Sequence, residues 1–564
     1  MGWETEQTTQ AGTRYGCFLP DLTGLARGLS AADLPPHYIR SRGRHGNLDQ
    51  PPLPSSKLAV LLGQNPRFVA GLPPVAALID NPRIREGAVI RVISLFGALV
   101  LAVISNASFA QDKPEASNMQ LVGYNDLQGR SAYQPWIHHQ GDRWIAYIGH
   151  HGGVPENEKP INPLTGQAEF NGTSIIDVTD PAHPKYLAHI PGEQGNYEAG
   201  GAQMVRVCDG KSLAKGDPNA VYLLRPFGNQ AHEIWDTADP GHPKLVTRIV
   251  EGLKGTHKSW WECDTGIAYL VSGEPGWRVP RMTQVYDLSD PAHPVKIRDF
   301  GLPGQQPGAA GATPTMLHGM ISLPKNNRVY FGYGTNEGGI LQIVDREKLI
   351  NGPKEPTDEN LRSPEVGRFL MSPFNGAHTT FPVLDMPIAE FAKDKIGKVR
   401  NFVIITDEQI QNECLEPRQF VWLVDVTVEN RPVSVATWMV PEASGNFCSR
   451  GGRFGTHSSN ENMTPIYYKR VMFFAHFNAG LRAVDIRDPY HPKEIAYYIP
   501  AVTANSDQRC ARRDDGTQHC AKVIQTNNVE VDDRGYIYIV DRANNGMHIL
   551  ELTGPAREAA NFPK

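Results

Sequence analysis

Four histidines recur at one kind of position in the chain, at the start of a strand-like segment. His257, His378 and His457 stand in GTH, GAH and GTH, and His318 stands in MLHGM before an alternating apolar run. Neutral imidazole is the commonest side-chain metal ligand. Four imidazoles at one point suit Fe(II), Cu(II) or Zn(II) and disfavour Mg²⁺ or Ca²⁺, which take oxygen ligands. The pattern predicts one transition-metal ion, iron or copper before zinc, held by these histidines.

Two other interpretations of the four histidines stay open. They could line a polar pocket that holds no metal, or they could be copies of a residue that suits the start of a repeated strand. Two of the repeats, around residues 340–349 and 421–442, have lost a second histidine motif but keep the strand-start histidine. That difference favours a role for the strand-start histidines beyond simple repetition.

The elements that would position the histidines come from an internal repeat. The clearest copies are TSIIDVTDPAHPKYLAHIPG (173–192), HEIWDTADPGHPKLVTRIVEG (232–252), TQVYDLSDPAHPVKIRDFGLPG (283–304) and LRAVDIRDPYHPKEIAYYIPA (481–501). Each is a short strand, a D-P-x-H-P turn and a second strand. In this turn Asp can bond backbone amides and Pro fixes φ, so His183, His242, His293 and His491 are expected to be turn residues. These copies resemble the LVIVD-repeat family, whose repeats are thought to build β-propeller blades, and the resemblance covers nearly all of residues 119–556.

Two further strand-like runs precede each copy, which gives four strands per unit of roughly 50–80 residues, as in a propeller blade. The last unit lacks its fourth strand, and MQLVGYNDLQG (119–129) can supply it, because a ring closed in this way leaves no open edge. The expected fold is all-β, a seven-bladed β-propeller over residues 111–564 whose ring is closed by an N-terminal strand. The blades are expected at about 130–192, 200–252, 255–304, 314–372, 376–442, 455–501 and 525–556.

A propeller places the starts of its innermost strands around one mouth of the central axis. The histidines occupy four consecutive blades, so the remaining blades should leave one side of the metal open to a substrate. The residues predicted to line this pocket are His138, His139, Gln203, His476, Asn527 and Asn528. Histidines on inner propeller strands are similar in placement to the iron site of carotenoid and stilbene cleavage oxygenases and to the copper site proposed for selenium-binding-type methanethiol oxidases. That similarity is one of architecture, since neither family's wider sequence is matched.

The N-terminal region has the sequence pattern expected of an export signal. Arg83, Arg85 and Arg91 precede a short apolar core, and SFA ends at residue 110 with small residues at the −3 and −1 positions. This is the anatomy of a secretory signal peptide (89–110), and the core is short for a membrane span; an N-terminal anchor or a buried helix is the other interpretation. Residues 1–88 are expected to be a disordered leader or a mis-called start. The mature protein, beginning at Gln111, should be periplasmic or secreted, with no stable membrane anchor after cleavage.

Six cysteines follow residue 110, an even number that is compatible with disulfides in an exported protein. Cys510 and Cys520 lie ten residues apart in one loop. Cys414 and Cys448 flank the outer strands of one repeat. Cys208 and Cys263 occupy matching heights on adjacent inner strands, so three pairs are predicted.

The composition and the motifs leave two classes of function. The charge balance of 55 Lys+Arg to 60 Asp+Glu has no basic block, so nucleic acid is not expected as a partner. No nucleotide-binding loop or nucleophile elbow is present. The first class is a metal-dependent enzyme, an oxidoreductase or lyase, acting on a small or aromatic molecule at the channel mouth, with its catalytic residues unassigned. The second class is a non-catalytic binding or adhesion propeller with a protein partner.

Overall fold

The computed structural model describes residues 111–154, 157–388 and 399–563. The predicted leader and signal peptide lie outside these residues. Within them the fold is all-β, with a few short helices: α2 (Arg346–Asn351), α3 (Asp358–Arg362) and α4 (Gly554–Ala559), and the 3-10 turns η2 (Leu127–Gly129), η3 (Gly210–Ser212), η4 (Pro324–Asn326), η6 (Glu442–Ser444) and η7 (Phe447–Ser449). No described helix combines the length and the apolar character that a membrane crossing requires.

Five sheets of consecutive antiparallel strands follow one another along the chain. The first contains β3 (Ala132–Gln140), β4 (Arg143–Gly152), β7 (Gly172–Asp177) and β8 (Lys185–Pro191), with β9 (Tyr197–Ala202) paired to β4 and a small hairpin of β5 (Ile161–Asn162) and β6 (Gln167–Ala168) beside it. The second contains β10 (Arg206–Asp209), β11 (Val221–Phe227), β12 (Ala231–Asp236) and β13 (Lys244–Val250). The third contains β14 (Trp260–Trp261), β15 (Ile267–Ser272), β16 (Met282–Asp287) and β17 (Val295–Phe300).

The fourth sheet contains β18 (Leu317–Leu323), β19 (Arg328–Tyr333), β20 (Ile340–Asp345) and β21 (Glu365–Leu370). The fifth contains β22 (Thr379–Pro387), β23 (Val399–Thr406), β24 (Val421–Asp425) and β25 (Val433–Trp438). The remaining large sheet has nine strands: two groups that join where Phe477 pairs with Thr526, and two strands from the start of the described chain, β1 (Glu115–Ser117) and β2 (Met119–Asn125), which are described below. One group is β26 (Phe454–Ser459), β27 (Val471–Phe477), β28 (Leu481–Asp485) and β29 (Lys493–Ile499); the other is β32 (Thr526–Val531), β33 (Ile537–Asp541) and β34 (Met547–Leu552). A separate hairpin of β30 (Gln508–Arg512) and β31 (Gln518–Lys522) lies between the two groups in sequence.

The first strands of the described chain pair with its last ones. β2 (Met119–Asn125) is antiparallel to β34, with Met119 opposite Leu552 and Asn125 opposite Met547. β1 (Glu115–Ser117) pairs with the outer edge of β29. The expected partnership between an N-terminal strand and the last strand is therefore present as a hydrogen-bonded pairing.

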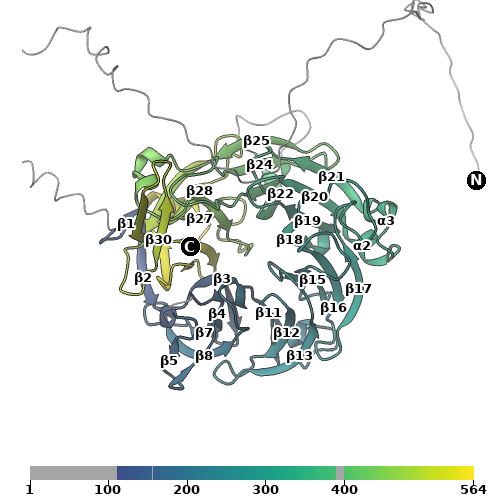
Figure 1. The fold of residues 1–564 in the computed structure, drawn as a ribbon, viewed down its shortest axis with the longest axis horizontal. Coiled ribbons are helices and arrows are strands. Elements are labelled where there is room, and N and C mark those ends of the chain that lie inside the picture. The colour runs from purple at the N-terminus through teal and green to yellow at the C-terminus, as the bar shows by residue number, and fades with distance from the viewer. Residues whose placement is uncertain (1–110, 155–156, 389–398, 564) are drawn as a thin grey trace, which may run out of the picture. The chain divides into compact units, whose positions relative to one another are not determined.

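The first strand of each four-strand group faces the middle of the domain. β3, β10, β14, β18, β22, β26 and β32 contact one another in succession, and β32 contacts β3. Figure 1 shows the sheets of residues 111–563 standing around a common centre, with β3 and β18 toward the inside and β13, β17 and β25 toward the outside. Apolar side chains fill the spaces between neighbouring sheets; one such cluster joins Tyr269 and Val285 to Phe331. This packing fixes the starts of the inner strands close together.

The D-P-x-H-P segments are turns with one repeated hydrogen bond. Histidine Nδ1 lies 2.8–3.1 Å from the aspartate Oδ2 three residues earlier in each copy, namely in the pairs His183–Asp180, His242–Asp239, His293–Asp290 and His491–Asp488. The histidine backbone N–H also donates to the carbonyl of the same aspartate. The expected role of these histidines in turn structure agrees with this geometry.

All six cysteines of the described chain are paired. The disulfides are Cys208–Cys263, Cys414–Cys448 and Cys510–Cys520, with sequence separations of 55, 34 and 10 residues. The structure joins the same partners as the sequence analysis. The first pair links the inner strand of the second sheet to the segment after β14, so it ties two neighbouring sheets together.

We expect thiol titration of the unreduced, denatured protein to detect none of these six cysteines. In the chain-entropy model the 55-residue loop stabilises by about 4 kcal/mol and the 10-residue loop by about 3 kcal/mol, because a longer closed loop removes more freedom from the unfolded chain. The double variant Cys208→Ala/Cys263→Ala should therefore lose more unfolding free energy in urea than Cys510→Ala/Cys520→Ala. Six reactive thiols would contradict the pairing.

Candidate metal centre

The four strand-start histidines come together where the inner strands begin. The Nε2 atoms of His257 and His318 are 3.0 Å apart. Successive ring centroids are separated by 4.5 Å (His257–His318), 3.8 Å (His318–His378) and 4.3 Å (His378–His457). All four side chains are buried. Strands β18 and β26 carry His318 and His457, whereas His257 and His378 lie in the segments that lead into β14 and β22.

Burial keeps these imidazoles neutral. Loss of hydration is the largest effect on each of the four, and it lowers the histidine pKa well below 6.5. His257 Nδ1 lies 2.9 Å from Gln203 Oε1, and His457 Nδ1 lies 2.5 Å from the Asn527 carbonyl. An oxygen acceptor at Nδ1 places the ring hydrogen there and turns the Nε2 lone pair toward the centre. Within the described residues Nε2 of His457 has no hydrogen-bond partner although it is buried.

Tyr133, which the sequence analysis did not select, fills the side of the cluster that was expected to be open. It is the second residue of β3, and its hydroxyl lies 3.2 Å from His257 Nε2 and 3.2 Å from His378 Nε2. The side chain is completely buried. The signal that could have identified it is its position, since the first sheet must also present a strand-start residue at this level.

Glu408 brings a carboxylate to the same group of side chains. It follows β23, and its carboxylate oxygens lie 3.8 Å from His318 Nε2 and 3.5 Å from His457 Nε2. Ligand atoms of His318, His378 and Glu408 all lie within 4.8 Å of one another. Burial raises the pKa of Glu408, while Arg453 and Arg542 favour its charged form. The donor set of neutral imidazoles with one carboxylate fits a transition metal better than Mg²⁺ or Ca²⁺.

Arginines lie on the outward side of Glu408. Arg453 Nη1 donates to Glu408 Oε1 at 3.0 Å, and Arg542 reaches the same oxygen at 3.5 Å. Arg542 also lies 3.1 Å from His151 Nε2 and 3.5 Å from Glu198. The Glu198 side chain is 43% exposed against 5% for Glu408, so solvent access decreases from Glu198 toward the histidines.

A second layer of buried charge lies on the inward side of the histidines. Thr379 Oγ1 is 2.9 Å from His378 Nδ1 and accepts a hydrogen bond from Lys258 Nζ at 2.6 Å. Lys258 also forms an ion pair with Glu461, whose other oxygen is 2.5 Å from Arg206. The Arg206 guanidinium lies over the rings of Trp136 and Trp260, at 5.0 and 4.9 Å from their centroids.

Glu530 completes this inner layer. Its carboxylate accepts hydrogen bonds from the backbone N–H groups of Glu461, Asn462 and Val531. Burial, followed by repulsion from Glu461, raises the pKa of Glu530 to about 8. Among the described residues, the hydrogen bonds of the Glu530 carboxylate all belong to this layer, and none joins it to one of the four histidines.

Three of the six predicted pocket residues lie near the centre as supports. Gln203 accepts from His257, the Asn527 side chain donates to the Tyr133 carbonyl at 3.1 Å, and Asn528 contacts the Gln134 side chain. These residues orient the histidines and the start of β3. The three residues lie beside the histidines and the start of β3. The side of the cluster that was expected to be open is occupied by Tyr133.

The structure places His138 and His139, both predicted pocket residues, away from the four histidines. Both lie on β3, but a strand rises about 3.3 Å per residue, so His138 is roughly 17 Å further along than Tyr133. His138 is bonded to Asp209 at 2.9 Å, and the ring of His139 stacks on Trp144 at 3.9 Å. The sequence analysis counted the histidines as near the strand start, whereas β3 begins at Ala132.

His476, the remaining predicted pocket residue, packs between strands of the sheets. It lies near the end of β27, the second strand of its group, and its buried ring packs against Phe454 and Trp438 at centroid distances of 5.1 and 6.2 Å. Burial lowers its pKa to about 3. His476 therefore belongs to the packing between sheets and does not face the four histidines.

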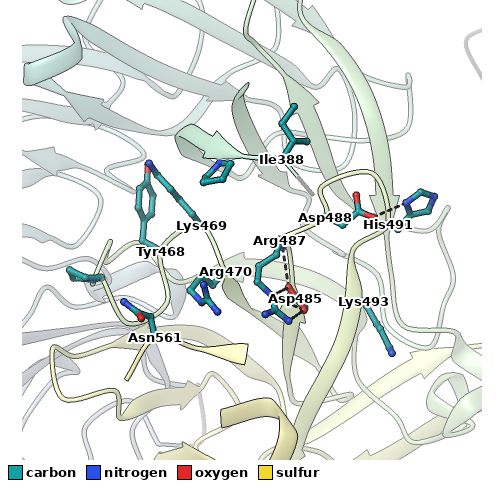
Figure 2. Close-up of a pocket in the computed structure, with 12 residues that line it drawn as sticks. Ile388, Tyr468, Lys469, Arg470, Asp485, Arg487, Asp488, His491, Lys493 and Asn561 are labelled. Carbon is teal, nitrogen blue, oxygen red and sulfur yellow. Dashed lines mark hydrogen bonds and ion pairs between the residues drawn. The ribbon is translucent and has the colours of Figure 1, made fainter. Parts of the chain in front are cut away.

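A pocket of about 730 Å³ lies away from this centre. Figure 2 shows it beside the turn that carries Asp488 and His491, with Lys469, Arg470 and Arg487 around it. Its lining includes none of the four histidines, Tyr133 or Glu408. Within this pocket Arg487 is hydrogen-bonded to Asp485. Because the pocket lies apart from the histidines, we assign it no part in the metal chemistry.

No protein-family model matches the chain, and the search of curated proteins returns no match. Solved structures with a similar fold are β-propeller proteins. They include the Cps50 (Swd1) beta-propeller domain of Myceliophteria thermophila (TM-score 0.42, 9% identity, 78% of this chain and 100% of that one) and a hypothetical selenium-binding protein from Sulfolobus tokodaii (0.44, 13%, 75% and 89%). Chaetomium thermophilum Raptor aligns at TM-score 0.45 and 10% identity over 79% of this chain, which spans only 30% of Raptor. Likeness at these values says nothing about activity or ligand.

Proposed function

We propose that this chain is a transition-metal-dependent enzyme, an oxidoreductase or lyase, whose metal is held by His257, His318, His378 and His457. The observation that carries the proposal is the convergence of four buried, neutral imidazoles, whose successive ring centroids lie 3.8–4.5 Å apart and two of whose Nε2 atoms, those of His257 and His318, are 3.0 Å apart. Neutral imidazoles that meet in this way can share one metal ion through their ring nitrogens. Iron or copper suits this donor set before zinc, and no nucleotide cofactor is expected.

The proposed scaffold is a seven-bladed β-propeller of the LVIVD-repeat type, with β2 closing the ring. The sequential contacts of the inner strands and the β2–β34 pairing support it. The three disulfides support a periplasmic or secreted location, because disulfides persist in oxidising compartments. Cleavage after residue 110 would then release the described chain without a membrane anchor.

A bound iron or copper ion would supply an electrophilic centre that activates oxygen, water or a substrate oxygen. The residues of this chain provide the rest of the site. Gln203 and the Asn527 carbonyl orient two of the imidazoles, and burial excludes bulk water. Arg542 and Arg453 lie on the exposed side of Glu408, where they can orient a small polar or aromatic molecule.

Metal analysis of the purified full-length chain tests this proposal. We expect about one iron or copper per wild-type chain and a loss of at least about ten-fold in His318→Ala, because a removed ligand leaves an incomplete site. His293→Ala is the matched control, since His293 lies in an exposed turn and is bonded only to Asp290 within the described contacts. Equal, negligible metal in wild type and both variants after reloading would rule the metal centre out. The non-catalytic binding propeller would then be the better description.

A further inference from the structure

The Tyr133 hydroxyl has unusual partners for a buried tyrosine. Among the described residues it lies within hydrogen-bond distance of the Nε2 atoms of His257 and His378, each at 3.2 Å. Several other buried tyrosines donate to oxygen acceptors; Tyr333, for example, donates to Gln342 Oε1 at 3.0 Å, and Tyr467 donates to the Gly535 carbonyl at 2.5 Å. The phenol oxygen of Tyr133 therefore lies against the Nε2 atoms of two imidazoles that the proposed function assigns to a metal.

The distances in this group match neighbouring donors around one metal ion. Imidazole nitrogens bind transition metals at about 2.0–2.1 Å, so two donors at right angles are about 3 Å apart and two tetrahedral donors about 3.4 Å apart. The His257–His318 separation is 3.0 Å, and the two Tyr133–imidazole separations are 3.2 Å. All three fall in the range expected for adjacent atoms of one coordination shell.

The scaffold holds Tyr133 in this place from both sides along the chain. The Asn527 side chain donates to the Tyr133 carbonyl, and the neighbouring Ser131 hydroxyl donates to the Arg542 carbonyl at 2.8 Å. Asn528 contacts Gln134 on the other side. A phenol fixed by its own backbone in this way needs little reorganisation to serve as a ligand.

We propose that the phenol oxygen of Tyr133 is a further ligand of the metal, beside the imidazoles of His257, His318, His378 and His457. This inference rests on the proposed metal centre. On binding, the phenol O–H bond breaks, an oxygen–metal bond forms, and the proton is released to water, so the ligand is a phenolate. Compared with an all-imidazole site, a site with an anionic oxygen donor is better suited to Fe(III) or Cu(II).

Copper loading tests the assignment without reference to activity. The full-length chain is stripped with a chelator, given one equivalent of Cu(II), and measured by visible absorption and by metal analysis. We expect a phenolate-to-copper charge-transfer band in the wild type, and loss of at least about ten-fold of that band in Tyr133→Phe with copper still bound. Tyr333→Phe is the control, because it removes a buried hydroxyl outside the cluster and should keep the band.

Each outcome separates this inference from the proposed function. Copper bound by wild type without the band overturns Tyr133 as a ligand and leaves the histidine centre standing. Failure of wild type to bind copper overturns both. If Tyr133→Phe does not fold, resonance Raman spectra of copper-loaded wild type made with ring-deuterated tyrosine decide the question: phenolate modes that shift with the isotope support coordination, and their absence contradicts it.

Discussion

Replacing Glu461 by glutamine is expected to lower the free energy of unfolding by about 3–5 kcal/mol, because it leaves two buried cations without their shared partner. Glu461 lies between Lys258 and Arg206, and the side chains of all three are almost completely inaccessible to solvent. Glutamine keeps the shape of the side chain but carries no charge. Urea unfolding at pH 7 measures the difference.

The matched control for Glu461→Gln is Glu429→Gln. Glu429 pairs with Arg328 at 2.7 Å, but both side chains keep part of their exposure to water. Pairs of this kind contribute up to about 1 kcal/mol. Equal losses of unfolding free energy in the two variants would mean that Lys258 and Arg206 are hydrated in solution. That result would contradict the burial of these two side chains in the folded chain.

Replacing Glu530 by glutamine is expected to remove a pH dependence worth about 4 kcal/mol between pH 5 and pH 8. The Glu530 pKa is about 8 in the folded chain, against an ordinary value of 4.5. Between these values the folded chain holds a proton that the unfolded chain has released. The stability from this group is therefore complete below about pH 4.5 and falls by about 1.4 kcal/mol per pH unit as the pH rises toward 8.

Urea unfolding of wild type and Glu530→Gln at pH 5, 6, 7 and 8 gives the free energy of unfolding of each protein as a function of pH. The contribution of Glu530 is the difference between the slopes of these two curves. The amide oxygen of glutamine can still accept from the backbone N–H groups of Asn462 and Val531, both of which bond Oε1 of Glu530, so the variant should fold. The hydrogen bond from Glu461 N–H to Oε2 is lost, and this loss is the same at every pH. The double variant Glu461→Gln/Glu530→Gln should be less stable at pH 8 than Glu461→Gln alone, because Glu530 is then the nearest carboxyl group able to ionise beside Lys258. Parallel pH profiles would show that Glu530 is ionised and hydrated at neutral pH.

The strand-start histidines were predictable because their neighbours in sequence repeat. The Gly–small–His pattern marks the same structural position in separate repeats, so His257, His378 and His457 could be aligned and His318 added by its place before an alternating strand. The disulfide Cys208–Cys263 followed from the same equivalence of positions. Repetition therefore carried information about which residues share a height.

Tyr133 and the inner charges could not be found in this way. The repeat pattern contains no tyrosine at the strand start, and two histidines further along β3 offered a more familiar chemistry. Lys258 and Glu461 are separated by about 200 residues in the sequence. From sequence alone, a charged side chain among polar neighbours is predicted to lie on the surface. Only the three-dimensional arrangement brings them together, because their burial depends on strands from different repeats.

The pairing of β2 with β34 has a consequence for how the chain reaches its native state. The two strands are separated by more than four hundred residues and exchange backbone hydrogen bonds from Met119 to Leu552. During synthesis β2 is made long before β34, so the backbone N–H and C=O groups at its edge lack their partner until the last strand has been made. Contacts between such distant segments slow folding and leave strand edges exposed to other chains. Truncation by a few dozen residues at the C-terminus should therefore produce aggregation rather than a smaller soluble domain.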